Sequence, residues 1–349
     1  MESTPIIKKE TKNRISVDYE GKLSFKERLM KKISTSHTWM KVVVNIFRFV
    51  LMLGVSYVIL FPFVSKVAGS FMSINDVVDA TVSLIPKNPT IDIYRYLFTD
   101  NRYAEAFGNT ILLSGLCAII QTFVSCLVGY GLAKFKFKGN NLLFALVIAI
   151  MIIPHGTLEI AMKRFFTDFD LIIPVSLNEH MNGIIEIFTG GRLNITNTFT
   201  PFVIMSLGGL AFKNGLYIYL MRQFFKGVPD ELEESAYVDG AGTFRTFLQI
   251  IIPLSVPMMI TVFLFSFSWQ WTDMFYTGVF FQGNNAPWML PNLIDEIPIH
   301  LQSNHSGQSI YDVVIHNTAG IMIILPLVIL YLFGQRYLVQ GIERSGLVG

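Results

Sequence analysis

The sequence predicts an all-α integral membrane protein with six membrane-spanning helices, because its charge is low and its apolar residues form long blocks. Of 349 residues, 52% are hydrophobic and only 15% are charged. Soluble domains carry about 25% charged residues. The mean hydropathy is +0.50. Burial of an ordinary soluble core does not require apolar residues to be gathered in this way.

Six apolar blocks reach the length that an α-helix needs to cross a bilayer, roughly 20 residues for about 30 Å of hydrocarbon. Such segments are expected to be helical, since backbone N–H and C=O groups find no water there and must pair internally. The alternative, a set of core helices in a large soluble protein, is disfavoured by six blocks of this length. The blocks cover residues 42–65, 107–133, 141–160, 200–225, 254–281 and 314–339.

The blocks divide the chain into four parts. Residues 1–41 are polar and basic and predict a tail with at most a short surface helix. Residues 42–106 hold the first helix and a loop, and residues 107–339 form a five-helix core. Residues 340–349 form a second tail. The first block starts too late for a secretory signal, so it is expected to stay as an anchor.

The placement of Lys and Arg predicts the orientation. Basic residues crowd the tail 1–41, whereas the loop at residues 282–313 contains no Lys or Arg. Under the positive-inside rule, and with an even number of spans, both termini are expected in the cytoplasm. The connection between the fourth and fifth blocks is then cytoplasmic too. The loop after the second block is also basic, with Lys134, Lys136 and Lys138.

The most informative local pattern is the connection at residues 226–253, called here the coupling segment. Pro229 suits a first helical position. Acidic side chains then favour the positive end of a helix dipole. These acids are Asp230, Glu231, Glu233 and Glu234.

Glycines in the coupling segment predict a sharp turn. Gly240 and Gly242 would end the acidic helix, and Thr243 is expected to cap the next helix, which re-enters the membrane. An acid-rich connection is unusual on the side where basic residues dominate. An ordinary loop is one interpretation; the functional one is a docking helix for a cytoplasmic partner.

The coupling segment resembles the cytoplasmic signature of permeases in binding-protein-dependent ABC importers. That signature reads Glu-Ala-Ala, three residues, Gly, nine residues, then Ile-x-Leu-Pro. The spacing is kept throughout, with Ser235 in place of the first Ala and Ile252 in place of Leu. The matching residues are Glu234, Ser235, Ala236, Gly240, Ile250, Ile252 and Pro253.

The resemblance covers most of the chain and points to the carbohydrate branch, similar to the maltose-type second permease. The tail 1–41 and residues 161–198 are less similar, and the second stretch is interpreted as an insertion on the outer side. The similar positions are Ser70-Phe71, Tyr94 to Phe98, Asn109-Thr110, Ala133 to Phe135, Phe137 to Gly139, Ile153-Pro154, Pro326, Gln335 to Tyr337, Gly341 and Gly349.

The resemblance implies a type I ABC importer permease in the bacterial cytoplasmic membrane, with a cytoplasmic coupling helix between helices four and five. Its expected partners are a homologous permease, giving a heterodimer, two ATPase subunits, an extracellular solute-binding protein and membrane lipid. ATP and Mg would be bound by the ATPase partner, with no cofactor in this chain. No basic tract with interleaved aromatic residues predicts nucleic-acid binding.

The resemblance also assigns roles in coupling. Glu234 would contact the ATPase, Ala236 would permit close approach, Gly240 would form the turn, and Pro253 would set the angle of re-entry. The expected coupling residues are Glu233, Glu234, Ser235, Ala236, Asp239, Gly240 and Pro253.

A weaker pattern indicates where a solute could pass. Asp273 lies near Trp269, Gln270 and Trp271 in the fifth block. Ionisable groups inside a membrane usually face a cavity or a partner, and aromatic faces with hydrogen-bonding groups suit a sugar. The rival interpretation is an interfacial aromatic belt. Lys213 in the fourth block could line the same path, pair with an acid of the partner permease, or extend to the interface.

No enzymatic centre is predicted. The sequence lacks a Gly-x-x-x-x-Gly-Lys-Ser/Thr loop and a Gly-x-Ser-x-Gly elbow, and its six histidines show no metal-ligand spacing. The alternatives are a permease for another small solute, such as an amino acid or a polyol phosphate, and a membrane-embedded enzyme acting on lipid. An ion-driven carrier should show inverted repeats, which the sequence does not display.

Overall fold

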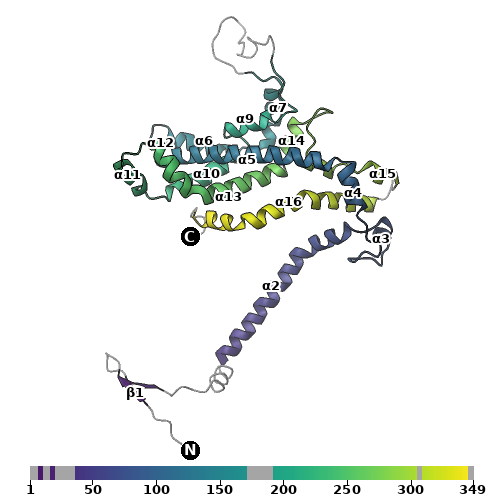
Figure 1. Ribbon diagram of the computed structural model, residues 1–349, viewed down its shortest axis with the longest axis horizontal. Helices are drawn as coiled ribbons and strands as arrows, with labels where there is room; N and C mark the ends of the chain where they lie inside the picture. The colour runs from purple at the N-terminus through teal and green to yellow at the C-terminus, as the bar shows by residue number, and fades with distance from the viewer. Residues whose placement is uncertain (1–6, 11–15, 20–35, 171–191, 305–308, 345–349) are drawn as a thin grey trace, which may run out of the picture. The chain divides into compact units, whose positions relative to one another are not determined.

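The computed structural model describes residues 7–10, 16–19, 36–170, 192–304 and 309–344 (Figure 1). By internal contacts the chain separates into two compact units, Met1–Ser65 and Lys66–Gly349. Helices make up most of the described residues, which confirms the predicted all-α class.

In the first unit, a short hairpin precedes a long helix. Strand β1 (Ile7–Glu10) pairs antiparallel with β2 (Ser16–Tyr19). The prediction of at most a short surface helix in this tail was therefore wrong. Strands of four residues are too short to give a clear alternating pattern in sequence. Helix α2 (Ser36–Gly69) begins ahead of the predicted residue 42 and is long and apolar enough to cross a membrane.

Three further helical runs of the described residues meet the same length and hydropathy criterion. These are α5 (Tyr103–Lys134), the continuous run Thr243–Trp271, and α16 (Ser309–Arg344). With α2 they correspond to the first, second, fifth and sixth predicted blocks. The run Thr243–Trp271 comprises α12 (Thr243–Thr246), the π-helix η2 (Phe247–Ile251) and α13 (Ile252–Trp271).

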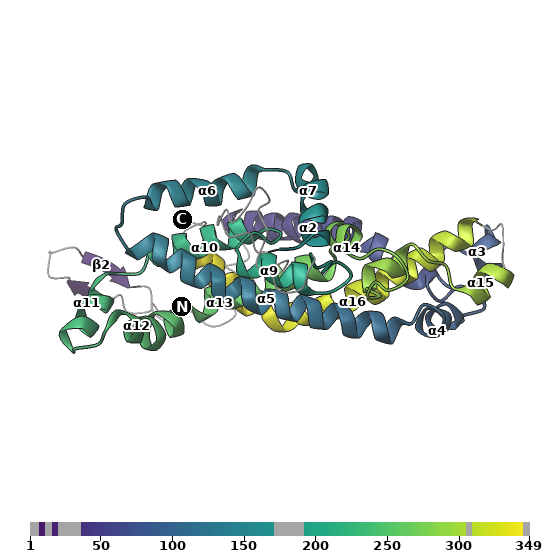
Figure 2. The same ribbon diagram turned by 90° about the horizontal axis from the view of Figure 1, so that it is seen from above.

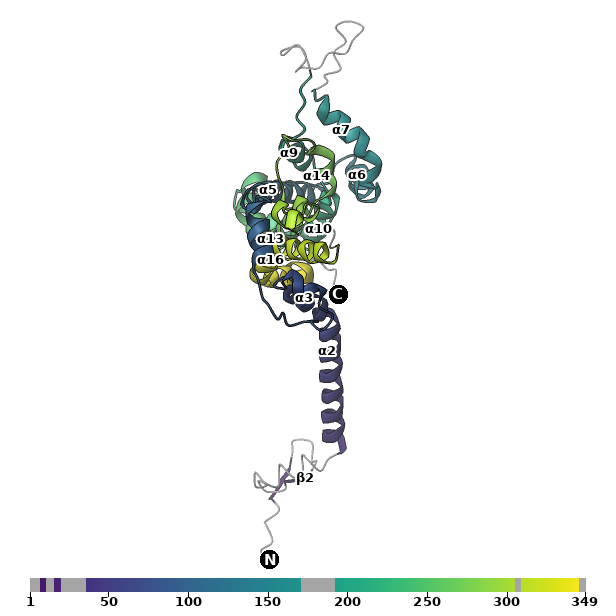
Figure 3. The same ribbon diagram turned by 90° about the vertical axis from the view of Figure 1, so that its right-hand side faces the viewer.

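The third predicted block is bent. Helix α6 (Asn140–Ile152) and the run His155–Thr167, formed by η1 (His155–Leu158) and α7 (Glu159–Thr167), meet at 95°. In Figure 3, α6 is seen nearly end-on and α7 rises from it. Pro154 explains the break, because a residue before proline is driven out of the α region. Ile153 accordingly has an extended backbone, with φ −63° and ψ 120°.

The fourth predicted block is also broken. Helix α9 (Thr200–Leu207) and α10 (Asn214–Lys226) are separated by a segment in which Gly209 and Lys213 have φ values of 69° and 62°. The described residues thus contain four spanning helices, or five if α6 and α7 form one span. The predicted count of six is not confirmed.

The second unit is built around α5. This helix packs against α9, α10 and α13, while α13 also packs on α16 and α10 on α6 (Figure 2). Gly129 of α5 permits the close approach of α10, since a Cβ at this position would lie 2.7 Å from Met221 Cβ. The apolar cluster beside this contact includes Tyr130, Tyr217, Phe225, Phe247 and Met258.

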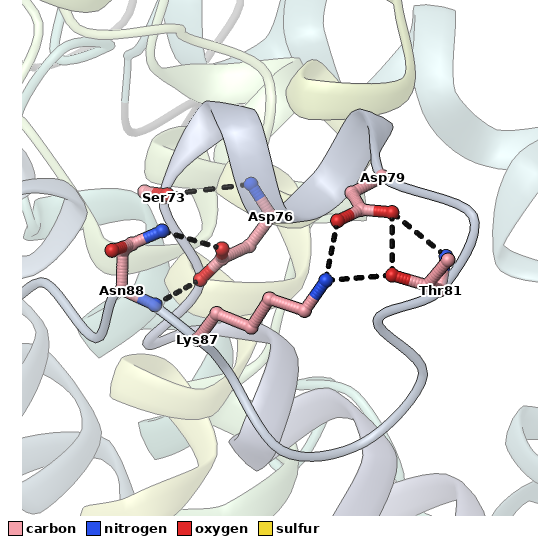
Figure 4. A network of polar contacts seen from close by, with 6 residues as sticks. All are labelled: Ser73, Asp76, Asp79, Thr81, Lys87 and Asn88. Atoms are coloured by element: carbon pink, nitrogen blue, oxygen red, sulfur yellow. Dashed lines mark hydrogen bonds and ion pairs between the residues drawn. The ribbon is translucent and has the colours of Figure 1, made fainter.

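At the far end of α5 from Lys134, two short helices and their loops pack on the bundle. They are α3 (Ile74–Val78) and α4 (Asp92–Thr99), joined by a polar loop (Figure 4). Asp76 accepts hydrogen bonds from the backbone N–H and the Nδ2 of Asn88, at 2.8 and 3.1 Å. Lys87 donates to Asp79 Oδ2 at 2.7 Å and to the Thr81 hydroxyl at 2.6 Å. These bonds give the loop a defined structure.

Two later elements meet the same end of the bundle. They are η3 (Leu290–Ile294) and α15 (Ile299–Asn304). The Asn101 side chain donates to the Glu296 carbonyl at 2.7 Å. The ring and backbone nitrogens of His300 lie 2.8 and 3.1 Å from Asp100 Oδ2. Most of the predicted insertion 161–198 lies outside the described residues.

Candidate functional site

The coupling segment forms the acidic helix and turn that its sequence predicts. Helix α11 (Glu231–Val238) carries three acids in its first turn, at Glu231, Glu233 and Glu234. The helix begins after Pro229 rather than at it. The Pro229 carbonyl nevertheless accepts the Leu232 N–H, so proline still opens the first turn.

Gly240 ends α11 by a Schellman motif. Its φ is +81°, a region that glycine enters at little cost. The Gly240 N–H donates to the Tyr237 carbonyl at 3.0 Å, and the Ala241 N–H donates to the Ala236 carbonyl at 2.9 Å. The turn thereby satisfies carbonyls at the end of the helix.

The entry into α13 differs in one detail from its prediction. Thr243 is the first residue of α12, whose N-cap is Gly242 with no side-chain cap bond, so the expected Thr243 cap was wrong. Pro253 is the second residue of α13, directly after η2 in the continuous helical run, so its missing N–H leaves that run one backbone hydrogen bond short. Between α12 and α13, η2 widens the helix by a π turn.

One lysine fixes α11 to the bundle. Lys134, the last residue of α5, donates to Asp230 Oδ1 at 2.5 Å and to the Val228 carbonyl at 2.6 Å. Its ammonium also lies 3.8 Å from Glu233 Oε1. The Lys134 hydrogen bond and charge lower the pKa of Asp230 from its ordinary value. The start of α11 is therefore tied directly to the end of α5.

A buried tyrosine makes a second connection. Tyr130, one turn before Lys134 on α5, lies 3.3 Å from Glu233 Oε2 through its hydroxyl. Its ring packs against Phe225 and Phe247 at centroid distances of 5.5 and 4.9 Å. Because these rings belong to α10 and η2, four elements meet at one side chain.

The acidic helix has two distinct faces. Glu233 and Ala236 are buried, and both face the bundle. The remaining predicted coupling residues are exposed and available to a partner; they are Glu234, Ser235, Asp239, Gly240 and Pro253. Apolar side chains accompany them, since Val238 and Phe244 are 87% and 73% exposed.

The residues of the fifth block that were predicted to line a solute path have different environments in the structure. Trp271 is buried, and its indole N–H donates to the Ile323 carbonyl of α16 at 2.9 Å. The buried Asp273 accepts from the N–H groups of Phe275, Tyr276 and Thr277 at 3.1–3.2 Å, and so caps α14 (Phe275–Phe280). Gln270 is buried as well. The side chains of Trp271 and Asp273 are thus occupied by hydrogen bonds within the protein.

Lys213 and Trp269 come together at the break between α9 and α10. The Lys213 ammonium lies 5.2 Å from the centroid of Trp269 and 5.0 Å from that of Phe212. Trp269 is 47% exposed. Within the described residues, Lys213 forms no ion pair with a carboxylate. It also lines a cavity of about 360 Å³ together with Pro154 and His155.

Residues 121–344 match the family described as "Binding-protein-dependent transport system inner membrane component". The chain belongs to this family. The match includes the coupling segment and every helix from the second half of α5 to α16.

Curated relatives extend the similarity of this permease. The arabinooligosaccharides transport system permease protein AraQ of Bacillus subtilis (strain 168) is 29% identical over 310 residues, covering 86% of this chain and 94% of the relative. AraQ of Halalkalibacterium halodurans is 26% identical over 298 residues, covering 84% and 93%. These relatives are transport permeases and not enzymes.

A solved structure has the same fold. The crystal structure of a bacterial ABC transporter involved in the import of the acidic polysaccharide alginate aligns with a TM-score of 0.67. The identity is 19%, and the alignment covers 85% of this permease and 97% of that chain. The predicted type I importer permease fold is thus confirmed.

Sequence reasoning missed the two residues of α5 that hold α11. Lys134 was predicted to belong to a basic loop and lies in the family-like stretch Ala133 to Phe135, but neither Lys134 nor Tyr130 was predicted to contact the acidic helix. The available signal was the spacing of four residues between them, which places both on one face at the end of a helix. Their acidic partners, about 100 residues later, could not be paired with them from one sequence.

Proposed function

We propose that this permease is the membrane-spanning subunit of an ATP-driven importer for carbohydrates, and for oligosaccharides in particular. The named relatives support the substrate class, since AraQ of Bacillus subtilis is described as an arabinooligosaccharide permease. The proposed energy source is a separate ATPase subunit, which would bind ATP and Mg. In this proposal the permease carries the solute across the membrane and catalyses no reaction.

The observation that carries the coupling proposal is the attachment of α11. A docking helix transmits motion only if it does not move independently of the bundle. Lys134 joins the start of α11 to the end of α5, and Tyr130 joins its buried face to α10 and η2. The exposed face, with Glu234 and Val238, is left for the ATPase.

The proposed assembly has a homologous second permease, two ATPase subunits and an extracellular solute-binding protein. A further solved structure supports the binding protein as a component. It is that of a bacterial alginate ABC transporter in complex with a periplasmic protein, and it aligns with a TM-score of 0.55 and 17% identity over 85% of this permease. In the proposed orientation both termini and α11 are cytoplasmic, as the lysine distribution favours.

We further propose that Lys213 and Trp269 contact the solute. A half-exposed indole offers an apolar face to a sugar ring, and the ammonium beside it offers hydrogen bonds. The left-handed backbone of Lys213 is a strained conformation of the kind that collects at functional sites. Trp269→Leu should raise the KM of uptake while leaving ATPase binding unchanged; equal uptake kinetics would remove Trp269 from the path.

Reconstitution with the cognate subunits tests the proposed function. Wild-type proteoliposomes should take up an oligosaccharide in the presence of ATP and the loaded binding protein. Glu234→Lys should reduce co-purification of the ATPase and uptake at least tenfold, because it reverses a charge on the exposed face. Glu159→Lys, a reversal on α7, serves as the matched control. Uptake of amino acids but not of sugars would replace the substrate assignment, and full activity of Glu234→Lys would remove the coupling assignment.

A further inference from the structure

A basic recess lies between the α5–α6 loop and the end of α10. Its volume is about 590 Å³. Four cations line it: Lys136, Lys138, Arg222 and Lys226. The lining contains no Asp or Glu. This arrangement gives the recess a strong positive potential.

Within the described residues none of the four cations lies within ion-pair distance of a carboxylate, although the charge of Lys136 contributes to the lowered pKa of Asp230. Lys134, in contrast, is committed to Asp230 and Glu233. Like charges gathered without counter-charges repel one another, and an anion that binds among them relieves this repulsion.

Arg222 is the most buried of the four cations that line the recess. Its side chain is largely buried, and its guanidinium lies 3.7 Å from the centroid of Phe144. Its Nε donates to the Leu132 carbonyl at 3.4 Å. Within the described residues its terminal nitrogens make no hydrogen bond, so they remain able to form a two-pronged contact with a phosphate.

The recess lies where three helix ends meet. Helix α5 ends at Lys134, α6 begins at Asn140, and α10 ends at Lys226. The first turn of α6 has no acidic residue and no side-chain cap, so its free N–H groups add to the attraction for an anion. Ends of membrane helices lie near the lipid headgroups. The exposed rings of Phe135 and Phe137 belong to the lining of the recess.

We propose that the recess binds the phosphate headgroup of an anionic phospholipid. The phosphodiester would lie against Arg222 and the start of α6, with the three lysines around it and its acyl chains along the exposed apolar face of α6. Basic pockets between membrane helices on the cytoplasmic side are a known form of lipid site. The proposal concerns lipid binding by this chain and does not depend on which solute is carried.

Native mass spectrometry of the purified complex tests the proposal. The complex is delipidated in detergent and titrated with phosphatidylglycerol or with phosphatidylcholine, which carries a phosphate but no net charge. The test variant is Lys136→Gln/Lys138→Gln/Lys226→Gln. The control, Lys66→Gln/Lys163→Gln/Arg164→Gln, removes the same charge away from the recess.

Wild type and control should retain phosphatidylglycerol at least tenfold better than phosphatidylcholine, and the test variant should lose this preference. Retention should weaken as sodium chloride is raised, since exposed charges are screened. Equal retention by the test variant would overturn the proposal. Displacement of the lipid by millimolar inorganic phosphate would assign the recess to a free anion instead. Loss of the ATPase with unchanged lipid binding would assign it to the subunit interface.

Discussion

The hydroxyl of Tyr130 lies 3.3 Å from Glu233 Oε2, joining the last turns of α5 to the buried face of α11. Lys134 completes this contact from one turn further along α5. The acidic helix is thereby part of the bundle rather than a loop suspended from it. The proposed mechanical coupling through α11 would require this attachment.

Lys134→Met should uncouple ATP hydrolysis from transport. The variant leaves Glu233 largely buried with no cation nearby, and a buried group without its partner costs about 1–3 kcal/mol. Helix α11 should then move relative to α5. Binding-protein-stimulated ATPase activity and uptake, measured in the same proteoliposomes, should show hydrolysis retained and uptake reduced at least fivefold.

Lys66→Met is the control for this prediction, because Lys66 is exposed and forms no ion pair with a described residue. If both variants transport at the wild-type rate per ATP hydrolysed, the Lys134 contact has no part in coupling.

Gly240→Ala should destabilise the turn after α11. The space around Gly240 is open, so the cost comes from the backbone, where a φ of +81° disfavours a side chain by about 1–2 kcal/mol. Gly242→Ala is a matched control, since the space there is open too and its φ is −76°. Uptake and ATPase co-purification should fall in the first variant only. A similar loss in both would show that the left-handed turn is not the cause.

Gly129→Ala should separate α5 from α10. The new methyl group would lie 2.7 Å from Met221 Cβ and 3.0 Å from the Arg222 backbone nitrogen, so backbone must shift. Overpacking of this kind costs about 1–3 kcal/mol. The thermal unfolding midpoint in detergent should fall relative to Gly131→Ala, where no atom lies within 4 Å of the added carbon. Identical midpoints would contradict the close packing of the two helices.

The contact between Asp100 and His300 should make stability depend on pH in the acidic range. Burial opposes ionisation of Asp100, but hydrogen bonds from His300 and Thr99 together outweigh it and lower the pKa of Asp100 below its ordinary value. A carboxyl with a lowered folded-state pKa stabilises the fold above its unfolded pKa of about 3.9. This stabilisation is lost as the pH falls through the folded pKa.

Unfolding midpoints between pH 3 and pH 7 check this prediction. Wild type should lose more stability than Asp100→Asn as the pH falls below about 4. Parallel profiles for the two proteins would show that Asp100 has the same pKa in the folded and unfolded chain.

The sequence predicted the spanning helices that depend on composition alone. Long, mainly apolar blocks became α2, α5, α13 and α16. The break between α9 and α10 was not predicted, because Lys213 has a left-handed backbone that depends on its surroundings and not on its own preference. Pro154 was recognised at the edge of its block, but the 95° bend also depends on how α7 packs on α14.

In the candidate site, the sequence predicted those features that depend only on residues close together in the chain. The acids at the start of α11 and the glycine at its end follow from the helix dipole and the left-handed turn. The division into a buried Glu233 and an exposed Glu234 could not be read from adjacent acids, since it depends on Tyr130 and Lys134. Asp273 likewise needed the structure to show that its oxygens cap α14.

The π turn at Phe247–Ile251 sets the rotational phase of the helix that follows it. A π turn holds one residue more than an α turn, and each residue of an α-helix advances it by about 100°. Deleting a single residue here would convert the π turn to an α turn and keep Met258 and Val262 in the apolar cluster, whereas a deletion within α13 before Met258 would rotate them out of it. The extra residue of the π turn therefore makes this stretch a place where a one-residue deletion preserves the packing of α13.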